Sequence, residues 1–206
     1  MHKLLLIFLS IGLLSFIINN NKIEETKMKK QEIATFGGGC FWCTEAIFSE
    51  LKGVVSVESG YSGGKIKNPT YGDICTGTTG HAEVIHIIFN PDEIHFSELL
   101  DVFFATHNPT TLNRQGADVG TQYRSVVFYH NNKQQIETKK FIKELEKSNV
   151  FEDKIVTQIT KFDIFYKAEA YHQDYFNNNK SQGYCNVVIN PKLIKFRKRF
   201  KDKLTN

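Results

Sequence analysis

The chain has 206 residues, 41% of them hydrophobic, and a formal net charge of +4 at pH 7. This length suits one compact domain with a short extension, since domains commonly have about 100–200 residues. The positive charge is too small for the basic surface of a nucleic-acid-binding protein, so we expect no nucleic-acid partner.

Residues 1–30 differ from the rest of the chain. Lys3 precedes a nearly continuous apolar run at residues 4–18, and a polar stretch follows up to residue 30. A basic start before a short apolar run is typical of a signal peptide, and the run is short for a membrane-spanning helix, which needs about 20 residues. We therefore expect a signal peptide or an N-terminal membrane anchor plus a polar linker. The protein would then be exported, periplasmic or membrane-anchored on the extracytoplasmic side, rather than cytoplasmic.

The first half of the remaining chain alternates strand and helix patterns. A short strand is predicted at residues 33–36, followed by a helix at 40–51 and a strand at 54–61. Residues 71–75 suggest a short helical turn. A further strand follows at 81–89, and a helix at 97–107 has Leu100, Phe103 and Phe104 on one face.

The second half begins with a polar loop at residues 108–122, and long loops of this kind are often functional. Strands are predicted at 123–129 and 155–162, around a charged helix at 133–147, and a short aromatic helix follows at 168–176. Residues 187–189 are predicted to be extended. A basic helix after Pro191 should pack one apolar stripe on the domain and leave its lysines in solvent.

This order of elements predicts an α+β fold. The expected architecture is a two-layer α/β plait, with a ferredoxin-like core and a mixed or antiparallel sheet on which helices pack. Residues 31–206 would form a single catalytic domain, with a C-terminal tail that carries Cys185.

The first chemical signal is the segment GGGCFWC at residues 37–43, where a strand gives way to a helix. Glycines let a ligand approach the backbone, and a helix N-terminus stabilises an anion. Cys40 at this point is expected to have a lowered pKa, and the thiolate is the nucleophilic form. Cys43 follows at i+3 on the same helix face, so a disulfide between the two is geometrically feasible. Phe41 and Trp42 would wall an apolar pocket.

This motif alone leaves two functional classes open: a Cys-x-x-Cys thiol-disulfide oxidoreductase, and an enzyme that reduces peroxides or sulfoxides. A zinc module is a poor alternative, because Cys75 and Cys185 are isolated and no second Cys-x-x-Cys pair exists. We therefore expect neither a metal nor another cofactor.

A second group of residues adds an acid and several hydroxyls. Glu83 lies on a strand that is otherwise largely apolar. Burial there raises the pKa of a carboxyl, which lets it hold a proton near neutral pH as a general acid. Tyr71 and Tyr123 offer hydroxyl donors, and Asp118 lies in the polar loop. Taken singly, the tyrosines are equally consistent with packing aromatics and Asp118 with a turn residue.

Three motifs follow one another along the chain: GCFW at 39–42, GHAE at 80–83 and GTQYRS at 120–125. Together with the sequence around them, over about residues 32–190, they closely resemble the peptide methionine sulfoxide reductase A family. A general thiol-disulfide oxidoreductase has no use for the second and third segments.

The resemblance implies an oxidoreductase that reduces the S epimer of methionine sulfoxide, free or protein-bound, and so repairs oxidative damage. Its usual reductant would be thioredoxin. Because thioredoxin itself is cytoplasmic, an exported enzyme would need a membrane-linked, thioredoxin-like donor.

The resemblance also implies roles for single residues. Cys40 looks like the nucleophile that becomes a sulfenic acid. Glu83 looks like the acid that protonates the sulfoxide oxygen, and Tyr71 and Tyr123 look like the hydroxyls that hold this oxygen.

The remaining site residues are implied in the same way. Asp118 looks like a polar member of the site that organises water and Glu83. Phe41 and Trp42 look like the pocket for the S-methyl group of the substrate.

Two thiols are candidates for resolving the sulfenic acid. Cys185 can attack Cys40 directly, Cys43 can do so, or the disulfide can pass from one to the other. We expect Cys185 to act first, because a flexible tail reaches Cys40 without straining the first helical turn. Cys75 is interpreted as structural.

Overall fold

The computed structural model describes residues 30–205. The segment for which a signal peptide or anchor is predicted lies outside these residues. Residues Gln31–Asn206 form one compact unit. Within the described part of the chain, no helix has the length and apolar character needed to cross a membrane.

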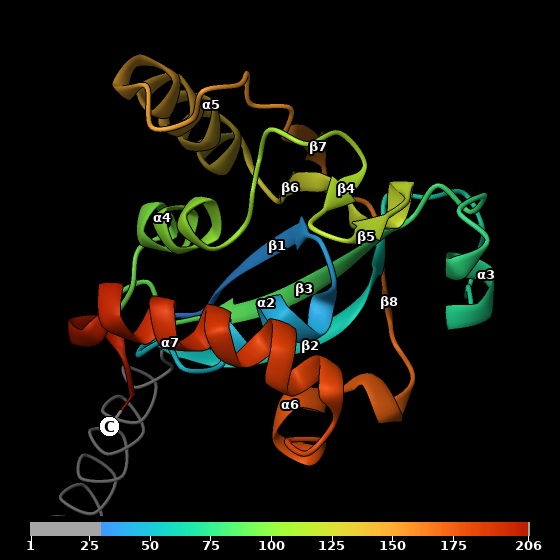
Figure 1. Ribbon diagram of the computed structural model, residues 1–206. Coiled ribbons are helices and arrows are strands. Elements are labelled where there is room, and N and C mark those ends of the chain that lie inside the picture. Colours follow the sequence, from blue (N-terminus) through green and yellow to red (C-terminus); the bar gives the residue numbers. More distant parts are fainter. Residues whose placement is uncertain (1–29, 206) are drawn as a thin grey trace, which may run out of the picture. The chain divides into compact units, whose positions relative to one another are not determined.

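A six-stranded mixed sheet forms the centre of this unit (Figure 1). Its strand order is β7-β6-β1-β3-β2-β8, in which β6 and β7 are parallel and the other neighbours antiparallel. The bounds are β1 Glu32–Gly38, β2 Val54–Ser62, β3 Ala82–Phe89, β6 Ser125–Tyr129, β7 Gln158–Lys161 and β8 Phe165–Lys167. Short apolar runs and glycine-bearing turns between them account for the strands that the sequence predicts.

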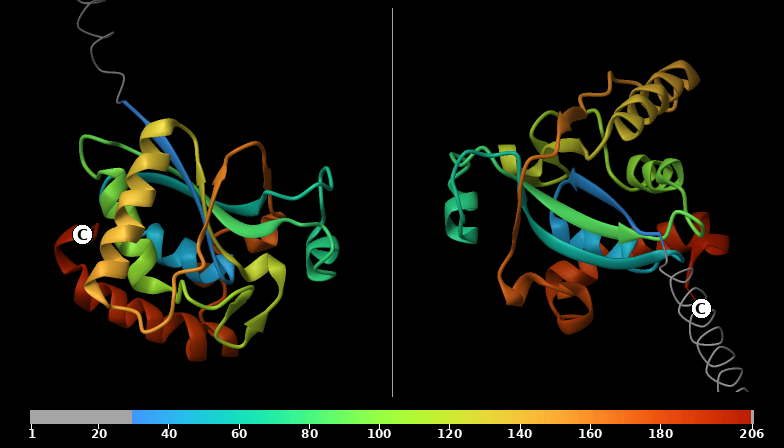
Figure 2. Two further views of the ribbon diagram at one scale, coloured as in Figure 1. Left: turned by 90° about the horizontal axis from the view of Figure 1, so that it is seen from above. Right: turned by 180° about the vertical axis from the view of Figure 1, so that it is seen from behind.

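The chain connection between β7 and β8 forces this sheet to curl. In a flat sheet the two outer strands would be separated by five spacings of about 4.8 Å, roughly 24 Å. The four Cα steps from Lys161 to Phe165 span about 14 Å at most. The two edges must therefore approach each other, and the connecting segment crosses the back of the sheet, as the rear view in Figure 2 shows.

Helices cover the other face of the sheet and close the main core (Figures 1 and 2). Three of them are α2 (Phe41–Phe48), α4 (Phe96–Thr106) and α7 (Asn190–Arg199). They bury a continuous apolar cluster against alternate residues of β1 and β3, such as Phe36, Ile85 and Ile87. The residues that alternate with them along the strands, such as Val84 and Phe128, face the back of the sheet, where they form a second, smaller cluster.

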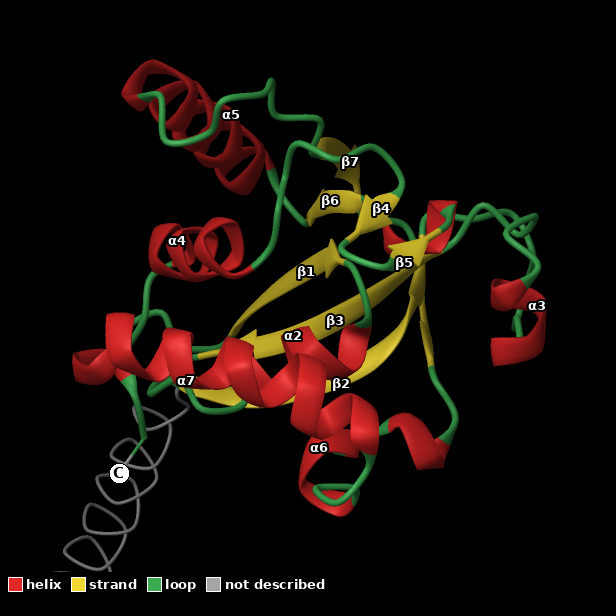
Figure 3. Cartoon of the chain, in the orientation of Figure 1, coloured by secondary structure: helices red, strands yellow, loops and turns green. Residues whose placement is uncertain are grey.

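The remaining helices lie outside this layer. Helix α5 (Asn132–Ser148) packs on α4, whereas α3 (Tyr71–Cys75) and α6 (Tyr175–Asn178) are single short helices (Figure 3). The arrangement confirms the predicted α+β class. The strands of its β-α-β-β-α-β core lie side by side in the order β6-β1-β3-β2.

Three predicted segments differ from the structure. The loop at 108–122 contains a small hairpin, β4 (Arg114–Gln115) and β5 (Asp118–Val119), whose two-residue strands are too short for a hydrophobic alternation to be visible. The helix predicted at 168–176 is broken into a 3₁₀ turn at Ala170–His172 and helix α6, and β8 precedes it.

The segment predicted to be extended at 187–189 is helical. Cys185–Ile189 forms one turn of π-helix that continues directly into α7. Its β-branched residues favour a strand locally, but Cys185, Ile189 and Leu193 recur at four-residue spacing and are buried in the core. Tertiary packing therefore overrides the local preference. The expected flexible tail is a packed helix.

Candidate active site

The antiparallel pairing of β1 and β3 sets the position of the site. Because the two strands run in opposite directions, the end of β1 at Gly38 lies beside the start of β3 at Ala82. Cys40 follows β1 after a single residue, Gly39, as the N-cap residue of α2, and Glu83 is the second residue of β3. Strand pairing therefore brings the predicted nucleophile and the predicted acid together at one end of the two central strands.

Two glycines make the close approach at this edge feasible. A Cβ atom on Gly37 would come within 2.9 Å of the Glu83 carbonyl oxygen, which no side chain can tolerate. Gly39 has a φ of 90°, a left-handed conformation that favours glycine, and a Cβ there would lie 2.6 Å from Gln115. The strand can thus turn sharply into α2 only with glycine at these positions.

A small cavity of about 150 Å³ opens at this point. Its lining residues are Cys40, Phe41, Trp42, Tyr71, Glu83, Asp118, Tyr123 and Tyr184. All seven residues predicted for catalysis or substrate binding are among them. The two predicted resolving cysteines, Cys43 and Cys185, do not line the cavity.

Glu83 is held in the wall of this cavity as a buried acid. Its side chain is 2% exposed, and the backbone N–H of Phe41 donates to its Oε2 atom at 3.0 Å. Burial raises the pKa of the carboxyl to about 8, against the opposing effect of the Phe41 hydrogen bond. Glu83 is therefore mostly protonated at neutral pH and can donate a proton to a ligand in the cavity.

Cys40 and Cys43 share one ionisation. A hydrogen bond between the two side chains, followed by burial and the nearby Glu83, raises the pKa of Cys40. The same hydrogen bond lowers the pKa of Cys43 to about 7, helped by the positive charge of Lys192. The lowered pKa predicted for Cys40 is not found in this arrangement, in which Cys43 loses a proton more readily than Cys40. Cys40 can gain the negative charge by transferring its proton along this hydrogen bond.

Two tyrosine hydroxyls face the same space and keep their protons. Burial, then a hydrogen bond with the exposed Cys75 thiol, raises the pKa of Tyr71. Burial, then the proximity of Glu83, raises the pKa of Tyr123. Both hydroxyls therefore act as neutral donors. Cys75, interpreted as structural, contributes nothing to the core and lies next to this site.

Glu169, which the sequence analysis missed, positions Tyr71. One oxygen of its carboxylate accepts from the backbone N–H of Tyr71 at 2.8 Å. The other accepts from the hydroxyl of Tyr61 at 2.9 Å. This clamp ties the start of α3 to the end of β2, so that Tyr71 stays over the cavity.

The Trp42 indole is fixed by two residues that no sequence motif singles out. Its Nε1–H donates to Nδ1 of His172 at 3.1 Å, and its ring stacks on Tyr175 at a centroid distance of 3.6 Å. Both partners come from the segment that precedes α6 or begins it. The contacts hold the indole as a rigid apolar wall of the cavity.

Tyr184 is a further lining residue that sequence reasoning missed. Its hydroxyl donates to Oδ2 of Asp118 at 3.1 Å and lies 3.9 Å from the sulfur of Cys43. Its neighbour Cys185 is fully buried and close enough to Cys43 to interact electrostatically. Only its place beside a cysteine could have drawn attention to Tyr184 in the sequence. Among residues 30–205, no cluster of three or more histidine, cysteine or acidic side chains is arranged to hold a metal ion.

Known proteins match nearly the whole described unit. The family profile described as peptide methionine sulfoxide reductase matches residues 32–204. The peptide methionine sulfoxide reductase MsrA of Saccharolobus solfataricus is 54% identical over 173 residues, which cover 84% of this chain and 97% of that protein.

Solved structures are also similar to this chain. The reduced form of Mxr1 from Saccharomyces cerevisiae superposes with a TM-score of 0.70 at 35% identity, over 77% of this chain and 91% of that chain. Mxr1 in complex with Trx2 gives a TM-score of 0.50 at 27% identity, over 72% of this chain and 87% of that chain.

Proposed function

The chain belongs to the peptide methionine sulfoxide reductase family and reduces methionine sulfoxide to methionine, and we propose that the reaction takes place on Cys40 and on the S epimer. One observation carries this proposal. A single cavity is lined by a thiol with a proton-sharing neighbour, a protonated carboxyl and two neutral tyrosine hydroxyls. These are the groups needed to remove an oxygen atom from sulfur.

The chemical step follows from these groups. Protonated Glu83 donates to the sulfoxide oxygen, while Tyr71 and Tyr123 hydrogen-bond to it, which makes it a better leaving group. The Cys40 thiolate supplies the electron pair that breaks the S–O bond. The oxygen ends on Cys40 as a sulfenic acid, and the substrate leaves as methionine, reduced by two electrons.

The aromatic wall accounts for the choice of epimer. Phe41 is buried and Trp42 is locked by His172 and Tyr175, so the S-methyl group has one rigid apolar surface to contact. The oxygen must point toward Glu83 while the methyl group contacts this wall, and Cys40 must approach the sulfur atom from a side that no substituent blocks. With the methyl and oxygen directions fixed and the approach of Cys40 kept open, only one sulfoxide epimer directs its remaining substituent out of the cavity.

The arrangement of sulfurs favours Cys43 as the first resolving thiol. Cys43 is already hydrogen-bonded to Cys40. Cys185 is fully buried within a continuous helix and lies near Cys43, so it cannot swing in as a tail. We infer a relay: Cys43 attacks the sulfenic acid and releases water, and Cys185 then receives the disulfide from Cys43.

Single-turnover reactions of two variants test this relay. In Cys43→Ser, we expect the sulfenic acid on Cys40 to persist, because Cys185 is buried within a continuous helix and neither it nor Cys75 lines the cavity. In Cys185→Ser, a Cys40–Cys43 disulfide should form at an undiminished rate. Trapping of the sulfenic acid and mass spectrometry of the disulfide-linked peptides distinguish the two products. A Cys40–Cys185 disulfide in the Cys43→Ser variant would refute the relay.

The disulfide must be reduced by a partner before the next turnover. The yeast relative Mxr1 is known in complex with Trx2. We infer that a thioredoxin or a thioredoxin-like protein is the reductant of this chain as well.

Turnover of the two separated sulfoxide epimers tests the proposed function. We expect reduction of the S epimer only, and little or no reduction of insulin disulfides, which a general thiol-disulfide oxidoreductase would catalyse. Release of methionine and loss of insulin solubility are the two measurements. Equal turnover of both epimers would exclude the rigid methyl site, and rapid insulin reduction would favour the alternative activity.

A further inference from the structure

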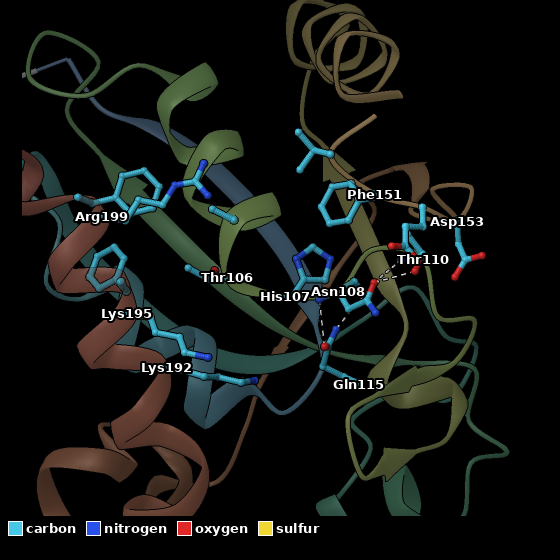
Figure 4. A pocket seen from close by; sticks show the side chains of 15 residues that line it. Thr106, His107, Asn108, Thr110, Gln115, Phe151, Asp153, Lys192, Lys195 and Arg199 are labelled. Carbon is cyan, nitrogen blue, oxygen red and sulfur yellow. Dashed lines mark hydrogen bonds between the residues drawn. The ribbon is translucent and has the colours of Figure 1, made fainter. Parts of the chain in front are cut away.

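A second and larger cavity, of about 780 Å³, lies beside α7 (Figure 4). It is bounded by α7, the end of α4 and the segment at 150–153. None of the residues that line the catalytic cavity belongs to it. Its volume is in the range of sites that hold sizeable ligands, about 300–1,000 Å³, whereas the catalytic cavity accommodates little more than a methyl sulfoxide group.

The two sides of this cavity carry opposite charges. Lys192, Lys195 and Arg199 stand along one face of α7, at the i, i+3 and i+7 positions of the helix. Glu152 and Asp153 belong to the facing segment. Figure 4 shows the three cations on one side, with Asp153 opposite.

Aromatic residues accompany the charged residues on both sides of the cavity. Phe151, Phe196 and Phe200 contribute to the lining of the cavity. A ligand that enters can therefore contact apolar rings while its charged groups reach the rim.

Among residues 30–205, Lys195 has no anionic partner, whereas Lys192 already acts electrostatically on the Cys43 thiol. Within residues 30–205, neither Lys192 nor Lys195 forms an ion pair or a hydrogen bond, and Arg199 has only a 3.6 Å pairing with Asp101. The uncharged polar residues of the cavity are occupied. Asn108 and Gln115 bond to each other through backbone and side chain, and both ring nitrogens of His107 are used. The groups left to receive a ligand are therefore charged: the cations of α7 on one side and the carboxylates of Glu152 and Asp153 on the other.

The two cavities share their bounding elements. Asp118 lines the catalytic cavity, and its cross-strand partner Gln115 lines the larger one. Tyr184 lines the catalytic cavity, and Lys192 follows on the same continuous helix and lines the larger one. The hairpin and the helix, which the hydrogen bond between Tyr184 and Asp118 joins, thus separate two neighbouring cavities, and a polypeptide that places one side chain at Cys40 would pass over this contact to reach the larger one.

We propose that the cavity beside α7 binds the polypeptide that flanks a methionine sulfoxide in a protein substrate, and that it favours flanks with carboxylate side chains. This proposal rests on the proposed function, because it names the substrate of the same site. Aspartate or glutamate side chains of the flank pair with Lys195 and Arg199, and apolar side chains pack on the phenylalanine rings. Glu152 and Asp153 repel carboxylates from the facing side, which confines them to α7.

Kinetics with matched peptides test this selection. Each peptide contains one methionine S-sulfoxide, with two aspartates, two serines or two lysines placed on one side of it at a time. On one of the two sides, we expect kcat/KM to be about fivefold higher for the aspartate peptide than for the lysine peptide at low salt, and the ratio to fall as salt screens the charges. Free methionine sulfoxide, which has no flank, provides the reference.

Variants of α7 locate the effect. In Lys195→Gln/Arg199→Gln, the ratio between the aspartate and lysine peptides should fall to near one, with turnover of the free sulfoxide unchanged. Lys198→Gln removes one charge from the same helix at an exposed position that does not line the cavity, and should keep the ratio. A ratio near one in the wild type, or a ratio that the double variant retains, would overturn the proposal.

Binding to an unreactive enzyme separates this proposal from the proposed function. Isothermal titration of Cys40→Ser with the same peptides measures affinity without turnover, and we expect the same about fivefold preference for aspartate. If the wild type reduced no sulfoxide but the titration showed the preference, the proposed function would fail and the binding site would stand. If turnover were normal and the titration showed no preference, only the binding site would fail.

Discussion

Replacing Cys40 by serine is expected to abolish reduction of methionine sulfoxide, with kcat reduced by roughly a thousandfold or more. Serine has no sulfur atom that could accept the sulfoxide oxygen as a sulfenic acid, and its hydroxyl does not ionise near neutral pH. No other thiol lines the catalytic cavity, so no other residue can replace the nucleophile. Release of methionine from the S epimer, followed over many turnovers, is the measurement.

The same variant should keep its fold, which makes the loss of activity interpretable. Cys40 is the N-cap residue of α2 and has no side-chain capping hydrogen bond. Serine is among the preferred residues at this position and stabilises a helix by up to about 1 kcal/mol relative to a non-capping side chain. We therefore expect a thermal midpoint equal to or above that of the wild type. Activity that survives in a correctly folded Cys40→Ser protein would remove the basis of the mechanism.

The sequence predicts the central part of this molecule well, because local and tertiary signals agree there. In β3, for example, a long apolar run forms a buried central strand, and the single carboxyl within it is Glu83. An unpaired carboxyl in such a run has few explanations other than chemistry. The glycines before Cys40 likewise predict a close approach of other groups to the backbone. In the structure these groups are the carbonyl oxygen of Glu83 and the side chain of Gln115.

The parts that the sequence does not predict depend on contacts between distant segments. The hydrogen bond from Trp42 to His172 joins residues 130 positions apart. Tyr184 reaches Asp118 only because residues 185–189 continue a helix rather than form a strand. An error in one local element therefore conceals a residue of the site, since it misplaces every side chain that the element carries.

The distribution of charge between Cys40 and Cys43 also lay beyond the sequence. A helix N-terminus argues for a lowered pKa at Cys40. In the structure, the hydrogen bond between the two side chains, burial and Glu83 raise the pKa of Cys40, while the same hydrogen bond and Lys192 lower the pKa of Cys43. Ionisation at Cys43 keeps the negative charge off Cys40, which lines the same cavity as the protonated carboxyl of Glu83. Binding of the substrate, which takes up that proton, removes the reason for the separation.

Replacing Glu83 by glutamine is expected to lower kcat/KM by about a hundredfold to ten-thousandfold, the usual contribution of a general acid. It should also change the pH profile. In the wild type, the rate rises as the cysteine pair loses a proton near pH 7 and falls as Glu83 loses its proton near pH 8. Glutamine does not titrate, so the residual activity should keep the acid limb and lose the alkaline one. An alkaline limb that persists in Glu83→Gln would assign it to another group.

The same substitution should raise stability at alkaline pH, which separates its effect on chemistry from damage to the fold. The carboxyl has a pKa of about 8 in the folded protein and 4.5 in its unperturbed state. The folded state therefore holds a proton that the unfolded chain releases, and wild-type stability declines as pH rises from 4.5 through 8. Glutamine avoids this decline and still offers an oxygen to the N–H of Phe41.

Calorimetry at pH 4 and pH 8.5 should show a thermal midpoint above that of the wild type only at the higher pH. A gain of equal size at both values would contradict a buried, protonated acid. The cost of keeping Glu83 buried is thus measurable as stability, and its catalytic benefit as rate, in one variant.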